Sequence, residues 1–163
     1  MTHNHLTALP ENIGCLSSLK ELRIYNNQLT RLPESLGKLT NLRELHAMNN
    51  VLENLPESIE NLQELRELRL FQNRLKSLPE SIGKLANLHT LDLRNNHLTV
   101  LPDSLSNLRS LTSLDLRANR LNSLPKGIGE LIYLEKLDVR WNKLSSVPAW
   151  FQQLEDRGCS VYI

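Results

Sequence analysis

Leucines recur along the chain with a spacing that repeats every 23 residues. The repeat is clearest in the stretch Leu88–Pro102, where an asparagine stands among the leucines and a proline closes the unit. The same skeleton returns 23 residues upstream and 23 residues downstream. Repeats of this length are typical of solenoids, in which a unit buries its apolar face only against its neighbours. The pattern therefore predicts one stacked array.

Two further columns of residues keep the same period. The proline column contains every proline of the chain: Pro10, Pro33, Pro56, Pro79, Pro102, Pro125 and Pro148. The asparagine column consists of Asn4, Asn27, Asn50, Asn73, Asn96, Asn119 and Asn142. We expect a single domain over residues 1–163, with a partial repeat at 1–18, six repeats starting at residues 19, 42, 65, 88, 111 and 134, and a C-terminal cap at about 150–163.

The pattern within one unit predicts its local structure. Leu91 and Leu93 alternate with polar residues, which is the period of a strand, and strands of successive units should pair in a parallel sheet. The asparagine amide can satisfy loop backbone groups that would otherwise be buried unpaired. The Leu-Pro step should give an extended bend, followed by a short helical or 3₁₀ segment such as Glu80–Gly83. We expect glycines to suit the turn that ends this segment; they are Gly14, Gly37, Gly83 and Gly129.

The consensus LxxLxLxxNxLxxLPxxI/LxxL resembles the leucine-rich repeat family over essentially the whole chain. The 23-residue length and the LPxxIGxL tail are similar to its intracellular, Ras-group-related class, which also occurs in bacteria. The resemblance implies an α/β solenoid, a horseshoe segment with a concave parallel sheet and short helical or 3₁₀ convex segments. It also implies a non-enzymatic module for protein–protein interaction, although this fold hosts many unrelated ligands.

The two ends depart from the repeat. Near the C-terminus, Trp150 and Phe151 enlarge the convex segment, and Val161 and Ile163 match the strand template if one residue is inserted, which predicts a capping strand. The N-terminal partial unit has leucines but no polar cap, although solenoids need capped ends for solubility. We therefore expect that the chain starts inside a longer protein, or that another chain covers this edge. The covering chain could be a second copy, and light scattering would test that self-association.

Charge and cysteine content exclude several classes of protein. The 19 Lys and Arg residues nearly balance the 18 Asp and Glu residues, so the chain has no basic footprint for nucleic acid. It has no apolar run long enough for membrane insertion and no signal-peptide pattern. Cys15 and Cys159 stand near opposite ends, and no N-x-Ser/Thr sequon is present. These absences favour a reducing compartment. We expect a cytoplasmic location or, alternatively, a secreted effector that acts inside a host cell.

Four outward-facing columns remain for function once the leucines, asparagines and prolines are explained by folding. The Glu21 column is Glu21, Glu44, Glu67, Thr90, Ser113 and Lys136. The Arg23 column is Arg23, His46, Arg69, Asp92, Asp115 and Asp138. The Tyr25 column is Tyr25, Met48, Phe71, Arg94, Arg117 and Arg140. The Asn26 column is Asn26, Asn49, Gln72, Asn95, Ala118 and Trp141. The first three change character between the third and the fourth repeat.

The first three repeats carry the stronger candidate site. Tyr25, Met48 and Phe71 should form an exposed apolar stripe, and aromatic and Met side chains flanked by Arg are typical of interface hot spots. We predict a partner-binding surface, termed the N-terminal patch: Tyr25, Met48, Phe71, Arg23, His46, Arg69, Glu21, Glu44 and Glu67. The alternative is that a folded-back terminus or the curvature of the solenoid covers the stripe.

The later repeats permit two interpretations. Like charges on neighbouring strands are unfavourable alone, and the adjacent arginines can neutralise the aspartates as a solvated charge ladder. The alternative is a secondary binding surface, termed the C-terminal surface: Asp92, Arg94, Asp115, Arg117, Asp138, Arg140 and Trp141. Trp141 either extends a contact surface along the rim or packs beside the C-terminal cap.

Catalytic and metal-binding motifs are not evident. The aspartate spacing approaches that of a retaining glycosidase, but no pocket is implied and arginines should hold the carboxylates ionised. The histidines fall in different columns, neither cysteine has a second one nearby, and phosphate-loop and GxSxG motifs are absent. We therefore expect an interaction module without cofactor or metal that binds a protein or peptide. The alternative is the substrate-recognition part of a larger enzyme, such as a bacterial effector E3 ubiquitin ligase.

Overall fold

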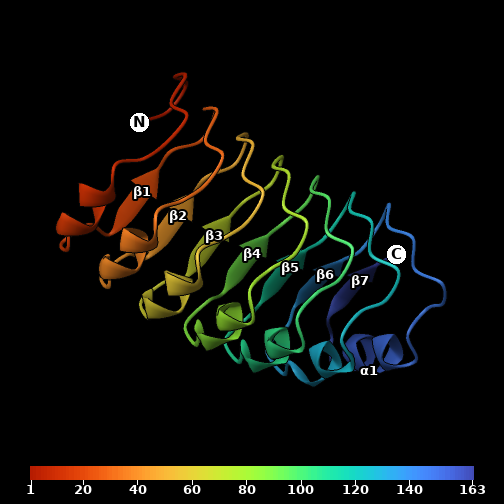
Figure 1. The fold of residues 1–163 in the computed structure, drawn as a ribbon. Coiled ribbons are helices and arrows are strands. Elements are labelled where there is room, and N and C mark those ends of the chain that lie inside the picture. The colour runs from red at the N-terminus through yellow and green to blue at the C-terminus, as the bar shows by residue number, and fades with distance from the viewer.

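Each unit contributes one short strand to a single sheet on the concave side of an open solenoid (Figure 1). The computed structural model describes residues 1–163. The strands are β1 (Glu21–Arg23), β2 (Glu44–His46), β3 (Glu67–Arg69), β4 (Thr90–Asp92), β5 (Ser113–Asp115), β6 (Lys136–Asp138) and β7 (Ser160–Tyr162). All neighbours are parallel and follow chain order, so each strand bonds only to the strands of the adjacent units.

Short helices stack on the opposite side of the solenoid (Figure 1). The 3₁₀ helices are η1 (Glu11–Cys15), η2 (Glu34–Lys38), η3 (Glu57–Asn61), η4 (Glu80–Lys84), η5 (Asp103–Asn107) and η6 (Lys126–Glu130). Each begins directly after a proline of the proline column, and five of these six prolines are extended, as Pro79 is with φ −70° and ψ 151°, with Pro125 as the exception. The pyrrolidine ring of the proline fixes its φ angle and so sets the bend from the loop into the helix, as we predicted from the Leu-Pro sequence. None of these helices is long and apolar enough to cross a lipid bilayer.

The glycines of the helical segments have a different role from the predicted one. Only Gly158 has a positive φ among the glycines of the chain, so Gly83 does not provide a left-handed turn. A Cβ atom on Gly83 would instead lie 2.3 Å from the carbonyl oxygen of Ser104 in the next unit. The helices of successive units approach so closely that a side chain at this position would push them apart, which is the physical reason for glycine here.

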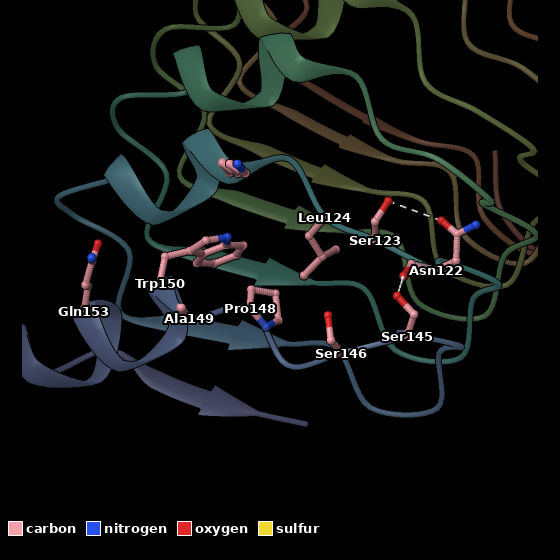
Figure 2. A pocket seen from close by; sticks show the side chains of 10 residues that line it. Asn122, Ser123, Leu124, Ser145, Ser146, Pro148, Ala149, Trp150 and Gln153 are labelled. Carbon is pink, nitrogen blue, oxygen red and sulfur yellow. Dashed lines mark hydrogen bonds between the residues drawn. The ribbon is translucent and has the colours of Figure 1, made fainter.

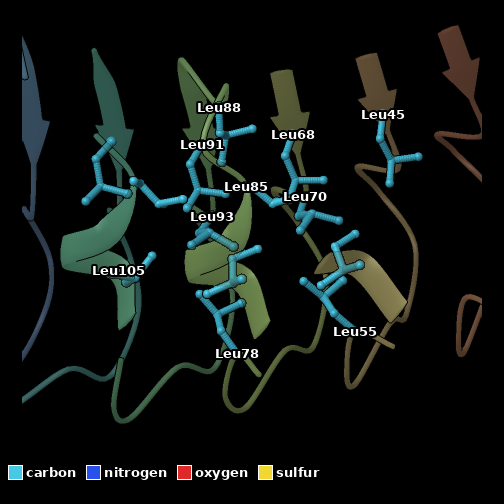
Figure 3. Packing of buried hydrophobic residues seen from close by; sticks show 14 of the residues in the cluster. Leu45, Leu55, Leu68, Leu70, Leu78, Leu85, Leu88, Leu91, Leu93 and Leu105 are labelled. Carbon is cyan, nitrogen blue, oxygen red and sulfur yellow. The ribbon is translucent and has the colours of Figure 1, made fainter. Parts of the chain in front are cut away.

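The core is a continuous column of leucine side chains between the sheet and the helices. Leu45, Leu68 and Leu91 point inward from successive strands and lie side by side across the units (Figure 3). They are fully buried and belong to one cluster of 42 buried residues that runs through the array. No unit buries these leucines alone, and each fully buried leucine contributes about 1.5–3 kcal/mol.

A ladder of buried asparagines holds the turns that leave the strands. The side-chain amide of Asn96 donates to the carbonyl oxygens of Leu93 at 2.9 Å and of Leu70 at 3.0 Å, while its oxygen accepts the Leu75 N–H at 3.0 Å. Leu70 and Leu75 belong to the preceding unit, so one side chain satisfies backbone groups of two units. Equivalent bonds recur at Asn50, Asn73, Asn119 and Asn142. The predicted role of this column is confirmed.

The C-terminal end closes with a helix and a last strand. The helix α1 (Trp150–Asp156) replaces the 3₁₀ helix of the other units. Within it, Phe151 is buried and packs edge-on against Trp150, with ring centroids 4.7 Å apart. Strand β7 pairs with β6 so that Val161 lies beside Leu137.

The N-terminal end remains open in this chain. The amino group of Met1 donates to the Arg23 carbonyl at 3.1 Å, and His3 N–H donates to the Tyr25 carbonyl at 3.2 Å. Residues 1–4 therefore run beside the first strand and its extension. The side chain of Leu16 is 51% exposed, because no earlier unit covers it.

Replacing Asn96 with Ala should lower the free energy of unfolding by about 2–6 kcal/mol. The buried Leu75 N–H loses its acceptor, which costs about 1–3 kcal/mol. The Leu70 and Leu93 carbonyls each lose one bond worth about 0.5–1.5 kcal/mol but keep a second bond, from Asn73 and Asn119 respectively. Urea denaturation followed by circular dichroism measures the change. The matched control is Asn87→Ala, since the exposed amide of Asn87 also bonds the previous unit, to the Gln63 carbonyl at 2.8 Å. That variant should lose only about 0.5–1.5 kcal/mol. Equal losses in the two variants would contradict a special role for the buried amide.

Candidate interaction surface

The strand register brings the residues of each outward-facing column side by side. Glu21 lies opposite Glu44 and Arg23 opposite His46, and the same alignment continues to β6. Beyond the strands the chains stay adjacent, because the Asn49 N–H donates to the Phe71 carbonyl at 3.0 Å. The N-terminal patch and the C-terminal surface therefore form two neighbouring parts of one face.

The apolar stripe of the N-terminal patch is half-buried, not fully exposed as predicted. The imidazole of His3 packs edge-on against Tyr25, with ring centroids 5.4 Å apart. The guanidinium of Arg94 lies 4.4 Å from the centroid of the Phe71 ring. The stripe is thus flanked by the N-terminal residues on one side and by the first arginine of its own column on the other. Part of each apolar side chain still faces the solvent.

Three glutamates and two arginines surround His46 on this patch. Arg23 pairs with Glu21, and Arg69 pairs with Glu67 at 2.9 Å. Desolvation acts to raise the pKa of Glu21, but its hydrogen bond and ion pair with Arg23 hold that pKa below the ordinary value.

His46 itself is only 8% exposed, so its predicted exposure was wrong. Its neighbours in the column are long arginine side chains from both adjacent strands.

The C-terminal surface contains a ladder of ion pairs. Arg117 contacts Asp115 at 2.6 Å on its own strand and Asp138 at 3.4 Å on the next, and Arg140 contacts Asp138 at 2.7 Å. Asp115 is 8% exposed and Asp138 is fully buried, which contradicts the prediction that both face the solvent. The arginine side chains and the last strand cover these carboxylates.

The two ends of the ladder differ in their electrostatics. Burial raises the pKa of Asp92 above its ordinary value, and the ion pair with Arg94 offsets only part of that effect. Burial acts in the same direction on Asp138, but hydrogen bonds from Arg140 and the nearby charge of Arg117 hold the pKa of Asp138 below its ordinary value of 3.8. The arginines of the ladder therefore stabilise the ionised form of Asp138, whereas at Asp92 the effect of burial is larger and disfavours the ionised form.

Aromatic residues frame the C-terminal surface. Trp141 is 70% exposed, so it does not pack beside the C-terminal cap. The guanidinium of Arg140 lies 5.6 Å from the Trp141 ring and 5.2 Å from the Tyr162 ring. Tyr162 was not among the predicted site residues, because it lies in the cap outside the 23-residue period. Its position between Val161 and Ile163, both expected to point inward, was the signal that it points outward.

The Asn26 column has an unusual backbone conformation in every unit. Its residues have φ between 53° and 60°, the left-handed region that asparagine tolerates better than other side chains. Trp141 adopts φ 60°, although tryptophan does not favour the left-handed region as asparagine does. Strained backbone positions are found preferentially at functional sites.

A hollow of about 450 Å³ lies away from these columns, among the loops near α1. The side chains of Leu124, Pro148 and Trp150 border it, and hydroxyl groups such as that of Ser145 line its other end (Figure 2). None of the predicted site residues lines it. Its only charged residue is Lys126, so no pair of acid and base groups is present.

Comparisons with known proteins agree with this geometry. A family model described as a leucine-rich repeat region matches residues 1–77 and 64–156. No curated protein matches the chain significantly.

Three solved structures illustrate the similarity. The chain is 32% identical to the ectodomain of the membrane receptor kinase GASSHO1/SCHENGEN3 from Arabidopsis thaliana, in complex with CASPARIAN STRIP INTEGRITY FACTOR 2, over 92% of this chain and 18% of that chain, with a TM-score of 0.81. It is 31% identical to the plant peptide hormone receptor RGFR1 in complex with RGF2, over 98% and 26% of the two chains, with a TM-score of 0.84. The repeat domain of the type III effector XopL is 28% identical over 100% and 67%, with a TM-score of 0.75. The chain thus spans about a quarter or less of either receptor.

Opposite effects are expected when the two end aspartates are neutralised. Asp138→Asn should lower the free energy of unfolding at pH 7 by about 1.5–3 kcal/mol, the usual contribution of a hydrogen bond to a charged group. Asp92→Asn should raise it, because the folded state disfavours the charge of Asp92. The stabilisation from Asp138 should be present above pH 3.8 and be lost as the pH falls through its lower folded-state pKa. Urea denaturation between pH 3 and pH 7 measures both, and equal shifts in the two variants would contradict the prediction.

Replacing Trp141 with Asn should raise the free energy of unfolding by about 0.5–1 kcal/mol, because asparagine avoids part of the cost of about 1–2 kcal/mol for a left-handed residue. Thermal and urea denaturation check this gain. Ala118→Asn is the control, since Ala118 has φ 53° and should gain similarly. A loss of stability in Trp141→Asn alone would show that the indole packs as part of the fold.

Proposed function

The chain belongs to the leucine-rich repeat family, and on that premise we propose that it is a protein-interaction module that binds a protein or peptide on its concave face. The observation that carries the proposal is the half-buried row of Tyr25, Met48 and Phe71 along three neighbouring strands. Rows of aromatic and Met side chains between charged groups have the composition of interface hot spots. Two similar plant receptors, each in complex with its partner and one of them a peptide hormone receptor, support the binding of a protein or peptide.

The mechanism of binding is recognition by a preformed surface. Strands β2 to β6 are each bonded to two neighbouring strands, and the asparagine ladder joins successive units, so the columns keep their spacing before a partner arrives. A surface that is ordered beforehand loses little conformational entropy on binding. An extended peptide that crosses the strands would meet one unit after another.

The two parts of the face offer different chemistry to such a partner. The N-terminal patch presents apolar side chains bordered by glutamates and arginines. The C-terminal surface presents Trp141, Tyr162 and Arg140, with the aspartates beneath them withdrawn into ion pairs. A partner with apolar groups at one end and a carboxylate near the other would complement both parts. The proposal contains no chemical reaction, and the aspartates of the C-terminal surface are engaged in ion pairs with arginines.

The alternative is that the chain is the substrate-recognition part of a larger enzyme, such as a bacterial effector E3 ubiquitin ligase. The similarity to the repeat domain of the type III effector XopL favours it. The same concave face would then select a substrate, and catalysis would belong to residues outside 1–163. The full coding region distinguishes the two: a further globular domain supports the alternative, and a stop codon directly after Ile163 excludes it.

Replacing Phe71 with Ala should weaken partner binding by about 1–3 kcal/mol, the range of a hot-spot residue, which is about 5- to 150-fold in Kd. The melting temperature should change little, because Phe71 is only half-buried and loses mainly its contact with Arg94. Peptides selected from a displayed random library against the intact protein provide the ligand, and isothermal titration calorimetry measures affinity.

Val100→Ala is the matched control, since Val100 is 58% exposed and lies in a loop away from the sheet. It should leave binding unchanged. An unchanged affinity in Phe71→Ala, or an equal loss in Val100→Ala, would contradict binding at the N-terminal patch. A large fall in the melting temperature of Phe71→Ala would show that the ring belongs to the core.

A further inference from the structure

The imidazole of His46 has a buried nitrogen with no hydrogen-bond partner. The residue is 8% exposed, and its Nε2 atom is inaccessible to solvent and unpaired. Nε2 lies 3.6 Å from Oε2 of Glu44 and 3.6 Å from Oε2 of Glu67, which is too far for a hydrogen bond. Buried polar atoms are nearly always paired, so this orphan nitrogen, which faces carboxylates, calls for an explanation.

The carboxylates around this nitrogen are themselves short of positive charge. Glu21, Glu44 and Glu67 stand opposite one another on β1, β2 and β3, an arrangement of like charges that destabilises a sheet. Arg23 pairs with Glu21 and Arg69 with Glu67, whereas the only ion-pair partner of Glu44 is His46. With His46 neutral, the cluster carries a net negative charge. A cation bound at its centre would remove the repulsion and provide a partner for Nε2.

We propose that Glu21, Glu44 and His46 bind a divalent transition-metal ion of the Zn²⁺ type. One ligand atom of each residue lies within 4.8 Å of the others. An imidazole nitrogen together with carboxylate oxygens suits Zn²⁺, whereas Ca²⁺ and Mg²⁺ prefer sites made of oxygen alone. Three protein ligands leave a fourth position of a tetrahedral ion for water or for a group of a binding partner.

The geometry requires only small movements of side chains. Ligand atoms around tetrahedral Zn²⁺ lie about 3.4 Å apart at bond lengths of about 2.0–2.2 Å. His46 and Glu44 already approach that separation at 3.6 Å. Glu21 must close the remaining gap, and its side chain is 42% exposed and free to turn from Arg23.

The cluster is confined to the first three units. In the later units the Glu21 column carries Thr90, Ser113 and Lys136, and aspartates take the place of His46. Glu44 and His46 lie two residues apart on β2, whereas Glu21 comes from β1, 23 residues before Glu44 and 25 before His46, so the set has no short sequence motif of histidines and cysteines. Only the alignment of neighbouring units brings them together.

The test is isothermal titration calorimetry of the chain with ZnCl₂ at pH 7, with His3 and His5 both replaced by Ala to remove the imidazoles near the N-terminus. The expected result is one ion per chain. Glu44→Gln and His46→Asn should each weaken binding at least about tenfold, since even the loss of an outer-shell partner costs about 10–100-fold. His89→Asn and Glu53→Gln, which change an exposed imidazole and an exposed carboxylate elsewhere, should leave the affinity unchanged.

Absence of saturable binding, an unchanged affinity in Glu44→Gln, or an equal loss in the two control variants would overturn the proposal. Excess Mg²⁺ should not displace Zn²⁺, and efficient displacement would also overturn it. Glu44 has a side chain that is 38% exposed, so Glu44→Gln carries the test even if His46→Asn does not fold. The titration uses the ion alone, so its outcome is independent of whether the concave face binds a peptide.

Discussion

The structure depends on the demand that buried backbone groups be hydrogen-bonded. Every unit turns inward after its strand and takes peptide groups away from water, where an unpaired group costs about 1–3 kcal/mol. One asparagine side chain per unit meets this demand for its own turn and for the preceding one. Because the amide bridges two units, it also sets their spacing. The leucine core and the parallel register follow from that spacing.

A strict period has a consequence for the outer face of the sheet. A residue type that recurs at one position of the repeat lies beside a copy of itself on the next strand. Charges of one sign therefore line up unless a second column carries the opposite charge. The later units solve this with arginines that contact aspartates on their own and on the next strand. The first units solve it less completely, and Glu44 and His46 remain without a full set of partners. The acidic groups on this face are therefore fully paired in the later units and incompletely paired in the first units.

The sequence predicted the fold, the register and the role of the asparagines, because each is decided within one unit and repeated. It did not predict features that depend on contacts between units or at the ends. The glycines were expected to serve a left-handed turn, but they allow a close approach to the next helix. The burial of His46 and Asp138, and the place of Tyr162 beside Arg140, depend on which long side chains and which terminal strand lie next to them.

The chain-order pairing of the strands also determines how the molecule would respond to force. Each strand is bonded only to its immediate neighbours, and the bonds between strands run along the axis of the stack. Tension applied to the two ends would act on every interface equally, because the units are connected in series, and the weakest interface would separate before the others. The edge at β1, which is covered by the N-terminal partial unit and not by a further strand, would yield first. The molecule would thus behave as an extensible spring that lengthens in steps of one unit.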